Sequence, residues 1–285
     1  MAKKIFTWSS SESQLYDKSY GSQKVQQGNF DKNVGSSFVM DAVDCGLMLY
    51  LDNNTGEIVW PVYTPSYREP ATIEIMNGTL IVTSGSQYIG VDPLKNEYLP
   101  ISLEISRNGN VEFNCKEQFT LDTDELSQLY LRDDATLSIK VEEGFAVFGG
   151  GELNALDNSE LKIYVPHFDF KHFKNDASIC FTVGCGNSSK CTSRVVFSSI
   201  ENSSVLETEN LPKGVFNFTT SGENNGRFIF EKAYGFAKAN LPGRELFSVD
   251  RNVIPPADFE SFFKVDNINK NNASAGFSVS YKGAL

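Results

Sequence analysis

The order of apolar and polar residues predicts an all-β protein that begins with a hairpin. Between Phe38 and Tyr63, two apolar, strand-favouring runs flank a polar Asn-Asn-Thr-Gly tetrad at 53–56. Asn and Gly tolerate the positive φ that tight hairpin turns require, so this stretch predicts two antiparallel strands. The second run reaches Pro61, whose nitrogen cannot donate a hydrogen bond, and we expect the strand to end there.

Two further hairpins are predicted around Asn-Gly pairs at 77–78 and 108–109, each of which lies between apolar runs. Three hairpins so close together are typical of a meander or sandwich. The expected fold is therefore all-β, with antiparallel sheets in a sandwich or jelly-roll-like arrangement. Additional strands are predicted at 136–141, 145–148, 161–165, 178–183, 193–199 and 276–281.

One short helix is expected between two β blocks. In residues 121–131, Leu126, Leu129 and Tyr130 recur at helical spacing, and Asp122 or Thr123 can cap the first turn. A second helical turn is expected at 258–263. The predicted division of the chain is an extended N-terminal arm (1–36), a first β block (37–118), a linking helix (119–135) and a second β block (136–285), the two blocks forming one domain or two.

The first 36 residues are polar but carry aromatic residues at intervals. A fully disordered tail is poor in aromatic residues, so this segment is expected to lie on a neighbouring subunit. The alternative is a frayed terminus whose rings pack on their own domain. The subunit-contact candidates are Phe6, Trp8, Tyr16, Tyr20 and Phe30.

Composition and charge exclude several function classes. The net charge is −11, whereas proteins that bind nucleic acids or anionic membranes through electrostatics need clustered Lys and Arg. No apolar run approaches the roughly 18 residues of a membrane span. The N-terminus has no apolar core of a signal peptide, so synthesis in the cytosol is expected. The partners expected are further copies of the chain or other virion proteins, and glycans, with no nucleic acid and no membrane.

Two repeated features have ordinary structural interpretations. Asn-Leu-Pro-Lys-Gly at 210–214 resembles Asn-Leu-Pro-Gly-Arg at 240–244, and each copy precedes a strand-like run. Two copies do not predict a solenoid, so we interpret them as a shared turn type. The run Gly149-Gly150-Gly151 lacks the lysine and helix start of a phosphate-binding loop, which favours a flexible turn or close backbone contact.

Candidate chemistry is sparse. The two histidines and three of the five cysteines are close in sequence, but without the tight C-x2-C spacing of a zinc knuckle. Reduced thiols are expected, with a zinc site or a Cys185–Cys191 disulfide as alternatives. Turn and helix-end roles explain Asp52, Asp122, Asp124, Asp133 and Asp134 better than calcium binding or acid–base catalysis does. No catalytic residue, cofactor or metal is assigned. The residues of the histidine–cysteine cluster are His167, His172, Cys180, Cys185 and Cys191.

The pattern favours a structural or assembly protein, not an enzyme. The most concrete version is a virion component, such as a phage capsid, decoration, tail or fibre protein, that forms a homo-oligomer and resides in the virus particle. The alternative is a carbohydrate-binding module or adhesin, which would stack sugars on the aromatic stripe of residues 227–238. A glycan-active hydrolase is a third hypothesis. The ligand-stacking candidates are Phe228, Phe230, Tyr234 and Phe236.

Overall fold

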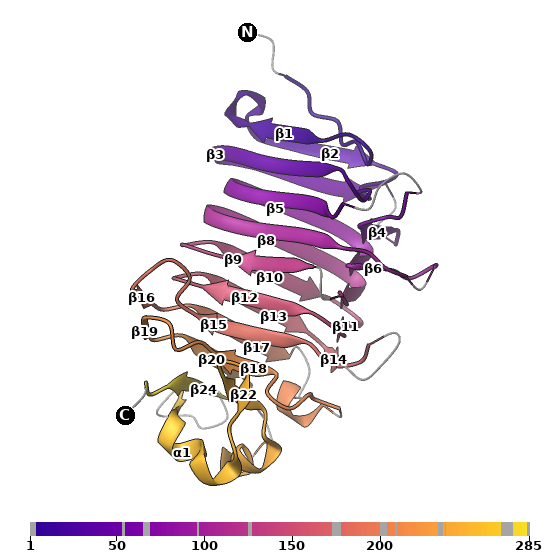
Figure 1. Cartoon of the computed structure of the whole chain (residues 1–285). Helices are drawn as coiled ribbons and strands as arrows, with labels where there is room; N and C mark the ends of the chain where they lie inside the picture. The colour runs from indigo at the N-terminus through magenta and orange to yellow at the C-terminus, as the bar shows by residue number, and fades with distance from the viewer. Residues whose placement is uncertain are drawn as a thin grey trace.

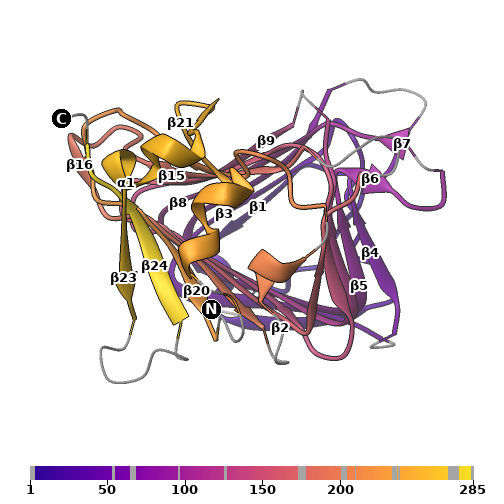
Figure 2. The same cartoon turned by 90° about the horizontal axis from the view of Figure 1, so that it is seen from below.

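The chain winds into successive coils whose strands lie side by side along one axis (Figure 1). The structure, a computed structural model, is a parallel β-solenoid. Viewed along the axis, the strands enclose a three-sided core (Figure 2). We call the three sides faces I, II and III. The structure describes residues 4–52, 55–64, 69–95, 97–124, 127–172, 178–199, 204–208, 210–232, 236, 238–268 and 276–283.

Face I is a stack of parallel strands, one from each coil. Each strand pairs with the strand of the next coil. For example, Phe216 lies in register with Phe247, one coil later. The strands are β1 (Gln14–Asp17), residues 37–41 of β3 (Ser37–Leu51), 71–77 of β5 (Ala71–Ile89), 101–105 of β8 (Ile101–Leu121), β9 (Gln128–Leu131), β12 (Glu152–Leu156), β15 (Cys180–Gly184), β18 (Phe216–Phe218) and β21 (Phe247–Val249).

Face II continues from face I across a corner of each coil. Strands β3, β5 and β8 turn this corner without interruption, with register shifts where they bend. The members of face II are β2 (Gln23–Gln27), 46–51 of β3, 79–84 of β5, 110–115 of β8, β10 (Thr136–Val141), β13 (Glu160–Val165), β17 (Arg194–Ser199) and β20 (Arg227–Glu231).

Face III is shorter and closes the triangle. It consists of β4 (Glu57–Trp60), 86–89 of β5, 118–121 of β8, β11 (Phe145–Phe148) and β14 (His167–Asp169). The other strands are β6 (Val91–Asp92), β7 (Glu97–Tyr98), β16 (Lys190–Cys191), β19 (Glu223–Asn224), β22 (Asn252–Val253), β23 (Phe263–Asn267) and β24 (Gly276–Tyr281). The helices are α1 (Phe259–Phe262) and 3-10 turns at Lys18–Tyr20, Val205–Glu207, Lys238–Asn240, Pro242–Arg244 and Pro256–Asp258.

The core is built from ladders of apolar side chains, one per coil. Because side chains alternate across a strand, the residues that share one register position all point inward. On face I the inward ladder starts with one phenylalanine, continues with four aliphatic residues and ends with three phenylalanines, and every member is 5% exposed or less. Its members are Phe38, Ile73, Leu103, Leu129, Leu153, Phe181, Phe216 and Phe247.

Both ends of the solenoid are covered by segments of the same chain. At the N-terminal end, the side-chain amides of Gln14, Gln23 and Gln27 hydrogen bond to the backbone of residues 4–9. At the other end, β24 pairs antiparallel with β20, and β23 pairs antiparallel with β24. These segments keep the outermost strands of faces I and II from presenting a bare edge, which would pair with other chains.

The all-β prediction is confirmed, but the strand pairing differs from the expected antiparallel sandwich or jelly roll. Antiparallel pairs occur at β6–β7, β21–β22 and the C-terminal β20–β24–β23 set, while the stacked strands pair in parallel. The predicted hairpin at 38–63 is wrong, because β3 and β4 both pair with β5 in parallel and lie on different faces. Strand β4 does end at Trp60, directly before the proline.

The hairpins predicted at 77–78 and 108–109 are solenoid corners. Gly78 has φ 97° and Arg107 has φ 51°, so the positive φ is used to bend a strand from face I to face II. Strands β5 and β8 each run through the corner. The repeated sequence at 210–214 and 240–244 likewise lies in successive coils, because each copy leads into a strand of face I.

The linking helix and the extended arm are also not what the structure shows. Residue 121 ends β8, and residues 128–131 form β9, because Leu129 and Leu131 face the core at strand spacing. Residues 125–126 lie outside the described part. Within 1–36, β1 and β2 pair with β3 and form the first coil. The helical turn expected at 258–263 is confirmed as α1.

Candidate ligand site on face I

A ladder of polar side chains runs along the outside of face I near its C-terminal end. Asn154, Thr182, Asn217 and Ser248 occupy one register position on four consecutive strands, next to the inward-facing ladder. All four are 7% exposed or less. The Asn217 amide donates to Thr182 Oγ1 at 3.3 Å, and the Ser248 hydroxyl donates to Asn217 Oδ1 at 3.1 Å. Hydrogen bonding within the ladder therefore offsets the burial of its polar atoms.

Arg251 lies in the tight turn that joins β21 to β22. Asp250 and Arg251 both have positive φ, 45° and 68°, which matches a two-residue hairpin turn that normally selects Gly or Asn. A side chain and a backbone amide of the preceding coil hold this turn. The Arg251 N–H donates to Asn217 Oδ1 at 2.9 Å, and the Thr220 N–H donates to Asp250 Oδ1 at 3.0 Å.

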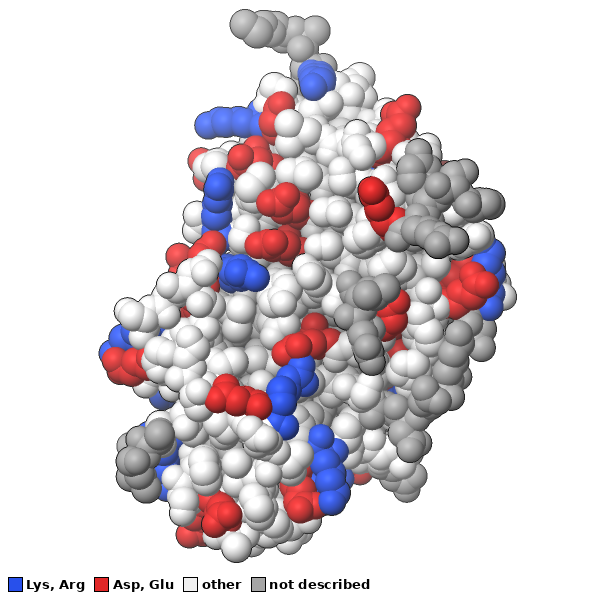
Figure 3. Space-filling view, in the orientation of Figure 1, with Lys and Arg blue, Asp and Glu red and all other residues white. Residues whose placement is uncertain are grey.

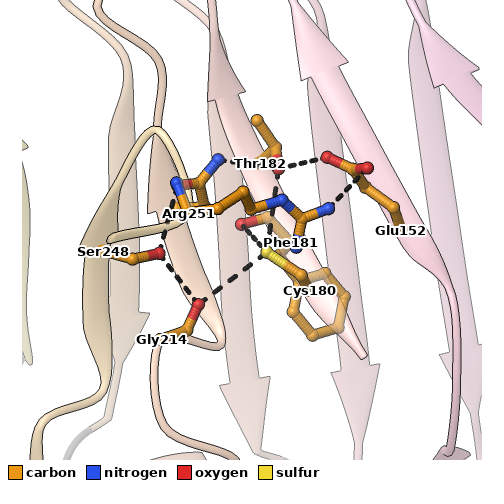
Figure 4. Close-up of polar contacts among 8 residues, drawn as sticks. Glu152, Cys180, Phe181, Thr182, Gly214, Ser248 and Arg251 are labelled. Carbon is orange, nitrogen blue, oxygen red and sulfur yellow. Dashed lines mark hydrogen bonds and ion pairs between the residues drawn. The ribbon is translucent and has the colours of Figure 1, made fainter. Parts of the chain in front are cut away.

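The Arg251 guanidinium forms an ion pair with Glu152, which lies on a strand three coils earlier along the solenoid (Figure 4). The Thr182 hydroxyl donates to the other carboxylate oxygen of Glu152 at 3.1 Å. The side chains of Arg251 and Glu152 are 48% and 40% exposed, so both charged groups remain accessible to a solute.

A hollow of about 420 Å³ opens beside this ion pair. Ser248 Oγ also lies 3.0 Å from the Gly214 carbonyl oxygen, which shares the single hydroxyl proton with Asn217 Oδ1, and Cys180 Sγ lies 3.8 Å from the same carbonyl oxygen. Burial raises the pKa of Cys180 to about 11, so the thiol is protonated at neutral pH and is a poor nucleophile. The lining residues are Ser178, Ile179, Cys180, Pro212, Lys213, Gly214, Ser248, Arg251 and Val253.

The charge around the hollow is balanced. Lys213 pairs with Glu245 as Arg251 pairs with Glu152. Figure 3 shows basic and acidic side chains interspersed over this side of the molecule. Glu74 and Glu104 stand in register on face I, and Glu104 lies 3.7 Å from Arg132 Nε.

A second polar cluster links three loops at another corner. Tyr98 Oη lies 2.5 Å from His172 Nδ1 and 3.2 Å from Asp122 Oδ2, and His172 Nε2 lies 3.6 Å from Asp122 Oδ1. The Gly150 N–H donates to Asp122 Oδ1 at 2.8 Å. The cluster fastens the segments that follow β8, β11 and β14 to β7. These residues are 24 to 74 residues apart, so no local sequence pattern predicts the cluster.

The glycine run 149–151 makes the close backbone contact that the sequence predicts. A Cβ at Gly151 would lie 1.8 Å from Thr123 Oγ1, and one at Gly149 would lie 2.3 Å from Asp122 Oδ1. Glycine is required there because the segment after β8 passes directly against it.

The subunit-contact candidates are packed on their own domain, as the alternative interpretation expected. Phe6, Trp8, Tyr16 and Phe30 are all 4% exposed or less, and Tyr20 is half-buried against the same cluster. The Phe6 and Tyr16 ring centres are 5.1 Å apart. Their rings therefore close the N-terminal end of the core and are unavailable to a neighbouring subunit.

The ligand-stacking candidates do not form an exposed platform. Phe228 and Phe230 are 0% and 1% exposed and point into the core from β20. Phe236 is partly buried with its ring 6.5 Å from that of Phe277. Tyr234 lies outside the described residues. The alternation that suggested a platform is that of an inward-facing strand.

The cluster of histidines and cysteines does not form a metal site. Among the described residues, which include all five, no three His, Cys, Asp or Glu side chains gather closely enough to hold an ion. Cys185 and Cys191 are buried free thiols.

In the part of the chain that the structure describes, no helix has the length and apolar character to cross a membrane.

Comparison with known proteins gives no relative. No family model, curated protein or solved structure matches this chain.

Proposed function

We propose that this chain is a structural and assembly protein that contacts neighbouring subunits through the sides of its solenoid, most concretely as a component of a virus particle. The observation that carries the proposal is the closure of both ends by the chain's own segments. The chain's own segments occupy the edges of the last parallel strands, β20 and β21, while three rigid sides remain exposed. Stacked repeats build such extended surfaces and commonly use them for binding.

Apolar side chains on the outside of the first two coils support a lateral contact. Leu15 is 54% exposed and stands in register with Val39 on face I. Val43 and Met48, at and beyond the following corner of β3, are 47% and 38% exposed. A group of exposed apolar residues around one corner is typical of a surface that another protein covers.

The test is the native mass of the purified protein by light scattering, followed by negative-stain imaging. We expect a defined oligomer or larger assembly, not the 31.6 kDa monomer. The double variant L15E/V43E should shift the mass towards the monomer. Its control is L94E, since Leu94 is 88% exposed on the distant loop between β6 and β7. A wild-type protein that stays monomeric at every concentration would contradict self-assembly. An oligomer whose mass is unchanged in L15E/V43E would show that these residues are not part of the contact surface.

A further inference from the structure

We propose that the hollow beside Arg251 binds a neutral, hydroxyl-rich saccharide. This activity goes beyond the structural role, and it uses a site remote from the exposed apolar residues of the first coils. The hollow is distinct from the aromatic stripe of β20, which is buried in the core.

The polar groups at the hollow match the hydrogen-bonding capacity of sugar hydroxyls. A hydroxyl both donates and accepts. The Arg251 guanidinium lines the hollow as a donor, and the Glu152 carboxylate that is paired with it is an acceptor, each about half exposed. Gly214 and Ser248 also line the hollow, but they are buried and the Ser248 hydroxyl is already hydrogen bonded, so the charged side chains are the groups open to a ligand. The volume of about 420 Å³ is within the usual range for small-molecule sites.

The charge balance favours a neutral ligand over an anion. Both cations that line the hollow, Arg251 and Lys213, already have carboxylate partners. An anionic ligand would have to displace these carboxylates or lie beside them, whereas a neutral polyol can bridge each pair without separating it.

The backbone at Arg251 indicates that its side chain has a use beyond the turn. A positive φ disfavours any residue with a Cβ, and glycine is the usual residue in such a turn. The turn's backbone contacts, from the Arg251 N–H to Asn217 and from Thr220 to Asp250, do not need the guanidinium. Asn217 is itself fixed within the buried polar ladder, so the ladder positions Arg251 over Glu152 before any ligand arrives.

The decisive variant is R251G, which suits the turn but removes the guanidinium. The matched control is R107G, because Arg107 is an exposed arginine with φ 51° at a corner far from the hollow. Binding is measured by saturation-transfer NMR on the full chain. The neutral probes are hexasaccharides of glucose, mannose, galactose and N-acetylglucosamine, and the anionic probes are hexagalacturonate and inorganic phosphate.

We expect at least one neutral hexasaccharide to bind, with a tenfold or greater loss of affinity in R251G and no change in R107G. Both variants should melt at or above the wild-type temperature. Should R251G fail to fold, E152Q keeps the turn and must weaken the same interaction. Absence of binding to all four neutral probes, binding to the anionic probes alone, or equal affinity in R251G or in a folded E152Q would each overturn the proposal. None of these results depends on the oligomeric state, so the structural role is tested separately.

Discussion

At the scale of single residues, position on the inward or outward ladder decides what a side chain does. Phe230 illustrates this because its ring stacks 5.7 Å from Phe197 and lies 5.1 Å from Phe216. The F230A variant should lower the free energy of unfolding by about 3–5 kcal/mol, since it removes a buried ring and leaves a cavity. Denaturant titration measures this loss. Phe145, 38% exposed on β11, is the control, and F145A should cost about 1 kcal/mol or less. Equal effects would contradict the assignment of Phe230 to the core.

Lys32 is a fully buried cation, and the burial of its charge lowers the stability of the folded protein. Its ammonium donates to the carbonyls of Ser9 and Glu12, at 2.9 and 2.7 Å, and lies 5.1 Å from the Trp8 ring centre. Burial lowers the pKa of Lys32 from 10.5 to about 8. Between these two values the unfolded chain binds more protons than the folded one, so stability from this group rises with pH.

The stability of the wild type relative to K32M should therefore increase between pH 7 and pH 10, by about 2 kcal/mol. Taking the difference removes the opposite contribution of buried groups with raised pKa values, such as Tyr16 and Cys180, which both proteins share. Urea titrations at each pH provide the values. A difference that is flat or falls with pH would show that Lys32 is not desolvated in the folded protein.

At the scale of elements, glutamine amides substitute for a neighbouring strand at the N-terminal end. Gln23 accepts from Phe6 N and donates to Lys4 O, and Gln27 bonds to both backbone groups of Trp8. The Q23A/Q27A variant should lose about 2–4 kcal/mol of unfolding free energy, at roughly 1 kcal/mol per lost hydrogen bond. Q26A is the control because Gln26 is exposed on the same strand. A double variant as stable as Q26A would show that the amides do not secure this end.

The sequence predicts the strands far better than their partners. Thr136–Val141, Phe145–Phe148 and Gly276–Tyr281 have the predicted bounds, because short runs of apolar or alternating residues leave a visible pattern. Parallel and antiparallel pairing leave the same pattern. An Asn-Gly pair suits a hairpin turn and a solenoid corner equally, since both bends need a residue with positive φ. That residue is Gly78 in one corner and Arg107, directly before Asn108-Gly109, in the other. Their spacing of one coil, with Asn77 in register with Asn108, was the available signal for a solenoid.

The candidate site could not be predicted from local sequence. Glu152, Thr182, Asn217 and Arg251 are separated by 30 to 35 residues, and coil lengths vary because the corners differ in length. Without the register of the stacked strands, these residues cannot be aligned from the sequence. The buried polar ladder also consists of the residue types found at solvent-facing strand positions, so the sequence does not distinguish the two.

At the scale of the whole molecule, the first 36 residues are part of the core's closure. Deletion of 1–36 removes β1, β2 and the rings of Phe6, Trp8, Tyr16 and Phe30, and bares the edge of β3. We expect the deleted protein to unfold or aggregate, as judged by circular dichroism and light scattering. A monodisperse, folded product of the long deletion would contradict this role.

The unequal closure of the two ends also bears on how the protein is made. The glutamine-secured end is complete once the first coils leave the ribosome, because its parts all lie within the first 51 residues. The opposite end stays open until β24, near the last residue, is synthesised. Throughout translation the newest coil therefore offers an unpaired parallel edge to whatever strand comes next. Neighbouring nascent chains on one messenger RNA would carry such edges at the same time, so slow elongation or crowded polysomes should favour chains that join to each other before either has finished.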